Sequence, residues 1–133
     1  MLKEFAAWLC TRVPGLTLGG NLQVGFRVQD APVRCHTLVE TGGPADFDLP
    51  YRTDVMIQVM TRAADNVQAH DDAWAVYTAI HGTSGWTIGP LVSGGQQYKL
   101  WTITAMAKPQ YLGPDEKFNH EYSCNYLIQA SPI

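Results

Sequence analysis

Hydrophobic and polar residues follow two different periods along this chain, and the periods predict its elements. Apolar residues recur at helical spacing in residues 2–13 and 64–80. Strand patterns cover six further segments: 21–28, 33–40, 54–61, 86–92, 98–107 and 121–130. The order α-β-β-β-α-β-β-β, with hairpins joined by short turns, predicts an α+β fold in which an antiparallel sheet packs against two α-helices.

Residues that break or cap helices set the ends of the two predicted helices. Pro14 and Gly15 stop the first helix. Asp65 or Asn66 can cap the start of the second helix, and Gly82 ends it. The second helix is expected to bury one stripe of side chains, which comprises Val67, Ala73, Trp74, Tyr77 and Ile80.

The strand patterns also predict which residues face the core. Residues 54–61 are apolar on both faces, which predicts a central strand covered on both sides. In the strand 33–40, Cys35 is expected in the interior and His36 on the opposite face. The strand 98–107 is expected to pair with the strand 121–130.

The segment 41–51 interrupts every pattern with glycine, proline and aspartate. It holds one phenylalanine, which either packs back on its own domain or is presented to a partner. Because long loops without structure of their own are usually functional or disordered, we hypothesise that this loop is an assembly element. Its candidate residues are Pro44, Asp46, Phe47, Asp48 and Leu49.

Composition narrows the class of protein. At 133 residues the chain is expected to form one domain, 1–133. It is 46% hydrophobic and only 16% charged, which is typical of a subunit that hides apolar surface in an oligomer. A net charge of −3 without a basic cluster argues against a nucleic-acid-binding protein. No apolar run approaches the roughly 20 residues of a membrane span, so no membrane partner is expected.

The pattern of cysteines and histidines does not indicate a metal site or a catalytic site. Three widely spaced cysteines without a Cys-x-x-Cys pair make a zinc site unexpected, and they are interpreted as buried thiols. His70, Asp71 and Asp72 are interpreted as the solvated face of the second helix. His81 is expected to meet the last carbonyl groups of that helix.

A cysteine–histidine nucleophile is hard to build from this sequence. Cys35 and His36 are adjacent in a strand and therefore face opposite sides. Cys124 and His120 share a face but are separated by about 13 Å of strand. No catalytic, cofactor-binding or metal-binding residue is predicted, and the chain is interpreted as an assembly protein rather than an enzyme. A small hydrolase or ligand-binding domain that uses Cys124 and His120 is the alternative of another class.

The segment 109–128 is the most informative part of the chain. Pro109 cannot donate a ladder hydrogen bond and ends the incoming strand, and Gly113 and Pro114 mark a turn before the return strand. The pattern resembles the C-terminal part of the siphophage minor capsid and tail-terminator family, in which a Pro-x-x-Leu-Gly-x-Asp-Glu turn leads into a strand with Glu-Tyr-x-x-Asn-Tyr/Phe. The matching residues are Pro109, Leu112, Gly113, Asp115, Glu116, Glu121, Tyr122, Asn125 and Tyr126.

Weaker similarities extend the resemblance over most of the chain. The segment 54–62 is similar to the family's Gln-Val-x-x-Arg strand, and the following helix and the turn 40–44 also fit. The sequence departs from the family pattern at Phe118 and Asn119, which stand where a Gly-Arg-like turn is expected.

The resemblance implies a structural virion protein that forms a ring, usually a hexamer, at the end of a siphophage tail tube. Such a tail terminator caps the tail and joins it to the head connector while DNA passes through. The implied partners are copies of the chain, the tail tube protein and head–tail connector proteins, in the virion neck and, during assembly, in the host cytoplasm. A neighbouring head–tail connector or head-completion protein is the alternative within this class.

If the chain forms such a ring, two further properties of its surface are expected. Subunit contacts are expected at the sheet edges formed by residues 21–28 and 86–92, because edge strands pair readily with another chain. A lumen that lets DNA pass should carry few basic residues, and the chain has 9 basic against 12 acidic residues. The candidate acidic residues that could line such a lumen are Asp54, Asp65, Asp71, Asp72, Asp115 and Glu116.

Overall fold

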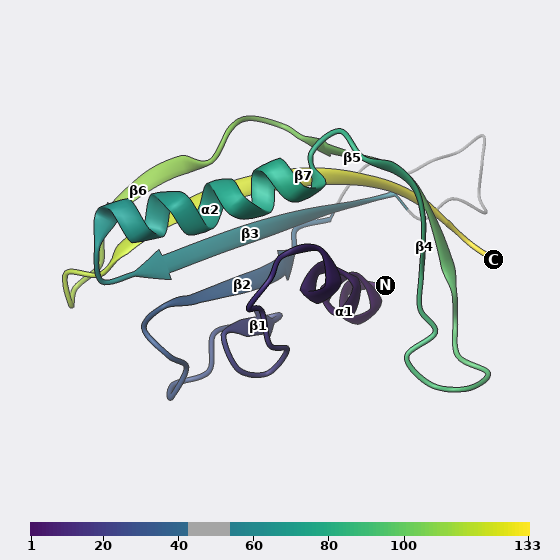
Figure 1. Cartoon of the computed structure of the whole chain (residues 1–133), viewed down its shortest axis with the longest axis horizontal. Coiled ribbons are helices and arrows are strands. Elements are labelled where there is room, and N and C mark those ends of the chain that lie inside the picture. Colours follow the sequence, from purple (N-terminus) through teal and green to yellow (C-terminus); the bar gives the residue numbers. More distant parts are fainter. Residues whose placement is uncertain (43–53) are drawn as a thin grey trace.

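The computed structural model describes residues 1–42 and 54–133, which form two helices and one sheet (Figure 1). The elements are α1 (Leu2–Arg12), β1 (Leu22–Val24), β2 (Cys35–Glu40), β3 (Val55–Ala63), α2 (Asn66–Ile80), β4 (Ser84–Ile88), β5 (Tyr98–Ala105), β6 (Gln110–Pro114) and β7 (His120–Pro132). The α+β class and the order of the predicted elements are confirmed. The short strand β6 is an addition to the prediction.

The strand order in the sheet is β1-β2-β3-β7-β5-β4, and β6 pairs with β7 beyond the end of β5. β1 runs parallel to β2, whereas the other described pairs are antiparallel, so the sheet is mixed. The predicted pairing of residues 98–107 with 121–130 is confirmed by β5 and β7. β1 and β4 lie at the two ends of the strand order, as expected for edge strands.

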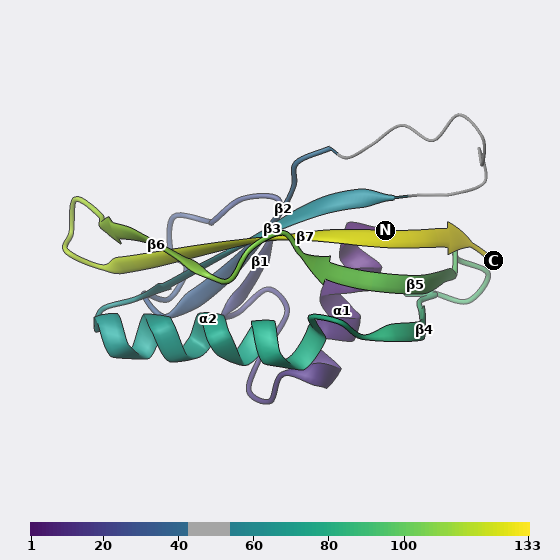
Figure 2. The same cartoon turned by 90° about the horizontal axis from the view of Figure 1, so that it is seen from above.

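Both helices cover the same face of the sheet (Figure 2). Their apolar side chains meet those of the strands in one core, which includes Phe5, Leu9, Val76 and Ile80 from the helices and Leu38, Ile57, Ile103, Tyr126 and Ile128 from the strands. Residues of β3 alternate between buried and half-buried. The prediction that residues 54–61 are covered on both sides is therefore wrong, because no described helix packs on the second face.

The two faces of β2 differ from the prediction. His36 lies opposite Thr61 on the helix-covered face, while Cys35 lies opposite Arg62 on the outer face. Both are buried, with 6% and 1% of their surface exposed. The outer face is covered at this point because the Arg62 guanidinium donates to the carbonyl groups of Pro32 and Val33, which holds the segment before β2 across the sheet.

Helix α2 begins as predicted, and Ala73 and Ile80 of the predicted stripe are buried. Asp65 caps it by accepting the N–H of Val67 at 3.4 Å. Val67 itself is 65% exposed, which contradicts the prediction. The buried stripe is Ala69, Ala73, Val76 and Ile80. Two alanines in this stripe allow the helix to approach β3 and β7 closely, and this moves the larger aromatic residues to its flank.

Two strands are shorter than predicted because the chain turns at glycine or proline. β1 ends before Gly25, which has a φ of +87° and donates its N–H to Leu38. Phe26 is consequently exposed instead of lying on the face of a strand. β4 ends before Gly89 and Pro90, and proline has no N–H with which to extend the ladder.

Candidate assembly surfaces

Most of the family-motif residues lie in the β6–β7 hairpin at one end of the molecule (Figure 1). Asn125 and Tyr126 lie farther along β7, where it pairs with β3. Pro109 precedes β6, and Leu112 and Gly113 lie within it. The register shifts between Tyr111 and Gly113, so Leu112 is the extra residue of a bulge. Gly113 pairs with Glu121 within the strand and does not lie in the turn as predicted. The turn that joins the strands starts at Asp115.

The Asp115 carboxylate organises this turn. Its Oδ1 accepts the N–H groups of Lys117 and Asn119, each at 2.8 Å. The Asp115 carbonyl accepts the N–H of Phe118 at 3.0 Å, and its N–H donates to the Asn119 carbonyl at 2.7 Å. The hydrogen bond from the Asn119 backbone is the main cause that lowers the pKa of Asp115. Glu116 lies beside it in the same turn.

Phe118 occupies the left-handed position of the turn, with a φ of +62°. Three-residue hairpin loops with a type I turn followed by a left-handed residue normally place glycine there. A bulky side chain at this position costs conformational energy. Phe118 is also 79% exposed, so the folded chain gains almost no burial from it.

A row of aromatic rings fixes the hairpin to α2. Neighbouring ring centroids lie 4.9 to 5.9 Å apart along the sequence of contacts from His120 through Tyr111, Tyr122, His70, Trp74 and Tyr77 to His81. Two hydrogen bonds strengthen the row: the Tyr122 hydroxyl donates to Asn66 Oδ1, and the Tyr111 hydroxyl bonds His120 Nδ1. The turn is thus presented in a fixed position relative to the helix.

An apolar groove of about 260 Å³ lies beside the edge strand β1. Leu22 and Val24 come from β1, Leu18 from the preceding loop and Leu91 from the loop after β4. Leu18 and Leu91 are both exposed. Lys3, Gly19 and Gln23 complete the lining. The groove therefore presents apolar side chains to solvent with one cation among its residues.

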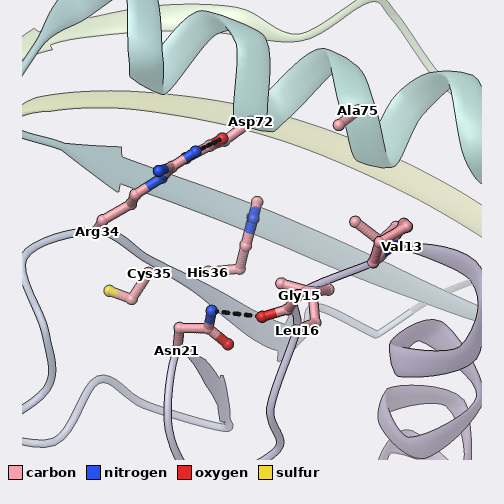
Figure 3. A pocket seen from close by; sticks show the side chains of 10 residues that line it. Val13, Gly15, Leu16, Asn21, Arg34, Cys35, His36, Asp72 and Ala75 are labelled. Carbon is pink, nitrogen blue, oxygen red and sulfur yellow. Dashed lines mark hydrogen bonds and ion pairs between the residues drawn. The ribbon is translucent and has the colours of Figure 1, made fainter.

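A second, more polar pocket of about 260 Å³ lies between β2, α2 and the end of α1 (Figure 3). Arg34 and Asp72 form an ion pair on one side, and the His36 ring rises from β2 beside them. His36 Nδ1 bonds Thr61 Oγ1 at 2.9 Å. Burial is the main cause that lowers the pKa of His36 to about 4, so the ring is neutral near pH 7.

The candidate nucleophile residues make other contacts. The Cys124 thiol donates to the carbonyl of Ala107 at 3.4 Å, and burial raises its pKa. Because the thiolate is the reactive form, this environment makes Cys124 a poor nucleophile. His120 bonds Tyr111. The structure therefore does not assemble a Cys124–His120 pair.

The histidine–acid cluster on α2 is divided between different partners. His70 lies 3.2 Å from Asp71, and both are exposed, as predicted. Asp72 instead pairs with Arg34. The His81 backbone N–H donates to the Tyr77 carbonyl at the end of α2. The ring differs from the prediction, because its Nδ1 accepts the N–H of Ala105 at 2.9 Å.

Three expectations remain: the candidate loop, the absence of a membrane span and the absence of a metal site. The candidate loop residues Pro44, Asp46, Phe47, Asp48 and Leu49 lie outside the described residues. Within residues 1–42 and 54–133, no helix is long and apolar enough to span a bilayer. In the same ranges no three histidine, cysteine or acidic side chains are placed to hold a metal ion.

The left-handed, exposed Phe118 and the groove at β1 were not identified from the sequence. A signal for Phe118 was present, because the turn 115–119 contains no glycine and departs from the family pattern at this residue. The groove had no such signal, since Leu18 and Leu91 are far apart in sequence and meet only in the folded chain.

These observations define a class of protein: a small α+β protein with large apolar side chains exposed at its surface. The sequence model of the family described as bacteriophage tail terminator protein matches residues 26–132. A comparison with curated proteins found no match. Because the family match covers most of the chain, the chain belongs to the bacteriophage tail terminator protein family, and it is a structural protein of the phage tail. The family resemblance inferred from the motifs is confirmed.

Proposed function

We propose that the chain is the ring-forming subunit that terminates a siphophage tail tube and joins it to the head connector. The family match over residues 26–132 carries this proposal. Its partners are copies of itself, usually six in a ring, the tail tube protein and head–tail connector proteins. It acts in the virion neck after assembly in the host cytoplasm, in a structural rather than an enzymatic role.

The surface of the subunit supports an assembly role. Several large apolar side chains are exposed on separate elements: Phe26, Val92, Trp101, Met106 and Phe118. Contiguous exposed apolar surface marks interaction sites, and the groove beside β1, with the exposed Leu18 and Leu91, is a surface of this kind. A ring subunit needs at least two contact surfaces for its neighbours and further surfaces for the tail tube and the connector, which suits this distribution.

The acidic residues support a lumen through which DNA passes. Asp71 and Glu116 are exposed, the first on α2 and the second in the β6–β7 turn. Asp65 caps α2, Asp72 pairs with Arg34, and Asp115 holds the turn, so these three also have structural roles. Carboxylates along a channel repel the phosphate backbone and reduce binding that would hold the genome.

The oligomeric state of the purified chain tests the proposal. Light scattering after size exclusion should give a particle several times the 14.7 kDa mass of the chain, and negative-stain micrographs should show rings with a central hole. Addition of isolated tail tubes should place these rings at the tube ends. A chain that stays monomeric at high concentration and does not bind tube ends would contradict the proposal.

A further inference from the structure

We infer that Phe118 of one subunit inserts into the apolar groove beside β1 of the next subunit. This inference rests on the proposed ring and names the contact that would join its members. The two surfaces come from different parts of the chain, so the contact is of the head-to-tail kind. Such contacts generate rings when the rotation between subunits closes.

Phe118 has the features of an anchor residue. It is the most exposed of the large apolar side chains in the described residues, and it sits at the tip of the hairpin with a left-handed backbone. Strained residues persist where the surrounding structure holds them in place, and they cluster at functional positions. Asp115 provides that support through its two hydrogen bonds within the turn. The aromatic row then fixes the hairpin on α2.

The groove has the size and chemistry to receive a phenyl ring. An apolar cavity of about 150 Å³ can hold benzene, and this groove measures about 260 Å³. Leu18, Leu22, Val24 and Leu91 would surround the ring with aliphatic carbon. Burial of an aromatic side chain in such a pocket is typical of the few residues that dominate the affinity of an interface.

The charges near the two surfaces favour a second copy of this chain as the occupant. The turn carries Asp115 and Glu116 on one side of Phe118, with Lys117 as its one cation. Lys3, a cation, is one of the residues that line the groove. The two carboxylates of the turn outnumber its one ammonium group, so we expect Lys3 at the rim of the groove to attract the turn when Phe118 enters.

The positions of the two surfaces allow every subunit to use both at once. The β6–β7 turn forms one end of the molecule, whereas α1 and the β4–β5 hairpin lie toward the other end (Figures 1 and 2). Leu91 lies between β4 and β5, and Lys3 belongs to α1. A chain cannot fill its own groove across this separation, so the contact must be made between subunits.

Engineered cysteines test the contact directly. In a Cys10→Ser background, which removes the partly exposed native thiol, Phe118→Cys and Leu91→Cys variants are mixed and oxidised under mild conditions. The mixture should form cross-linked dimers, and the double variant should form a ladder that ends at the ring. A Phe118→Cys variant mixed with Val67→Cys is the matched control, because Val67 is exposed on α2 away from the groove, and it should not cross-link.

Substitution of the anchor gives a second readout. Phe118→Ala should raise the dissociation constant between subunits by about tenfold or more, while the circular dichroism spectrum of the subunit stays unchanged. Leu91→Asp should have the same effect from the groove side. Rings that form as well in both variants, without the cross-link, would overturn the inference and leave the proposed ring intact.

Two other outcomes separate the inference from the proposed function. If the wild-type chain forms no ring in solution or on tail tubes, the proposed function fails and the inference fails with it. If Phe118→Cys cross-links to a tail tube or connector protein in assembled particles, and not to a second copy, the anchor belongs to another interface and the inference is wrong.

Discussion

Arg34 and Asp72 form a bidentate ion pair in which two guanidinium nitrogens each lie 2.8 Å from a carboxylate oxygen. The pair joins the residue before β2 to the middle of α2 and forms one wall of the polar pocket. Asp72 raises the pKa of the Arg34 guanidinium by hydrogen bonding and by charge. Because the Arg34 side chain is 60% exposed, the surrounding solvent weakens the attraction.

We expect Arg34→Ala to lower the free energy of unfolding by less than about 1 kcal/mol, as for other exposed pairs. Asp72→Asn should cost a similar amount, and the double variant should cost less than the sum of the two. Urea unfolding at low and at high salt measures this, and the effect should shrink as salt screens the pair. A loss that does not depend on salt would contradict the electrostatic explanation.

His36 should make stability depend on pH. Its pKa falls from 6.5 to about 4 on folding, mainly because of burial; the charge of Asp72 favours the protonated form and that of Arg34 opposes it. The unfolded chain therefore binds the proton more tightly than the folded chain. The stabilisation is fully present above pH 6.5 and is lost as the pH falls toward 4, by roughly 3 kcal/mol in total.

Urea unfolding at several pH values between 7.5 and 4, on the wild type and on His36→Gln, checks this prediction. Glutamine does not titrate and can still bond Thr61, so the variant should lose the part of the pH dependence that His36 contributes. The difference between the two curves removes the contribution of the carboxylates. Parallel curves for the two proteins would mean that His36 is accessible to protons in the folded chain.

Phe118→Gly should stabilise the subunit and weaken its assembly. Glycine adopts a positive φ without a steric cost, so the free energy of unfolding should rise by about 0.5 to 1 kcal/mol. Phe118→Ala keeps the Cβ and the left-handed backbone, so its stability should remain near that of the wild type. Denaturation of the monomeric fraction measures both, and a destabilised glycine variant would show that Phe118 packs within its own subunit.

The assembled ring should bind duplex DNA weakly even at low salt, where electrostatic attraction is strongest. The chain has 9 basic against 12 acidic residues, and its sequence holds no basic cluster. A gel-shift titration at low ionic strength, with a basic DNA-binding protein as the positive control, makes the measurement. Submicromolar binding that weakens steeply with added salt would reverse this expectation.

The loop at residues 41–51 is expected from its sequence to take part in assembly. Deletion of residues 44–49 should leave a folded subunit with an unchanged far-ultraviolet spectrum but reduce ring formation or particle completion. Replacement of Phe47 alone by serine tests whether the aromatic residue carries the effect. Rings and particles that form normally from the deletion variant would exclude this role.

The parts of the fold that were predicted correctly depend on local signals. The start of α2 follows from an aspartate that caps the first turn, and this capping needs only neighbouring residues. The ends of the helices follow from breakers for the same reason, and β5 and β7 were each recognised from their own alternation of apolar and polar residues. These features are specified within short stretches of sequence.

The parts that were missed depend on contacts between distant segments. His36 rather than Cys35 faces the helices because β2 pairs with β3 in one particular register, and two alternating faces of similar polarity do not reveal that register. Arg34 and Asp72 are 38 residues apart, and nothing in either neighbourhood predicts their contact. Only at Phe118 did the sequence carry an overlooked signal, since a glycine is normally required there.

The thirteen-residue strand β7 also determines when the subunit can fold during synthesis. It pairs with β3 along one side and with β5 and β6 along the other. Until residues 120–132 leave the ribosome, β3 keeps an open edge and most of the sheet cannot close. A chain cut short before this strand would lack both the centre of the sheet and the hairpin that carries Phe118. The residues that hold the finished chain together would thereby also exclude unfinished chains from the proposed ring.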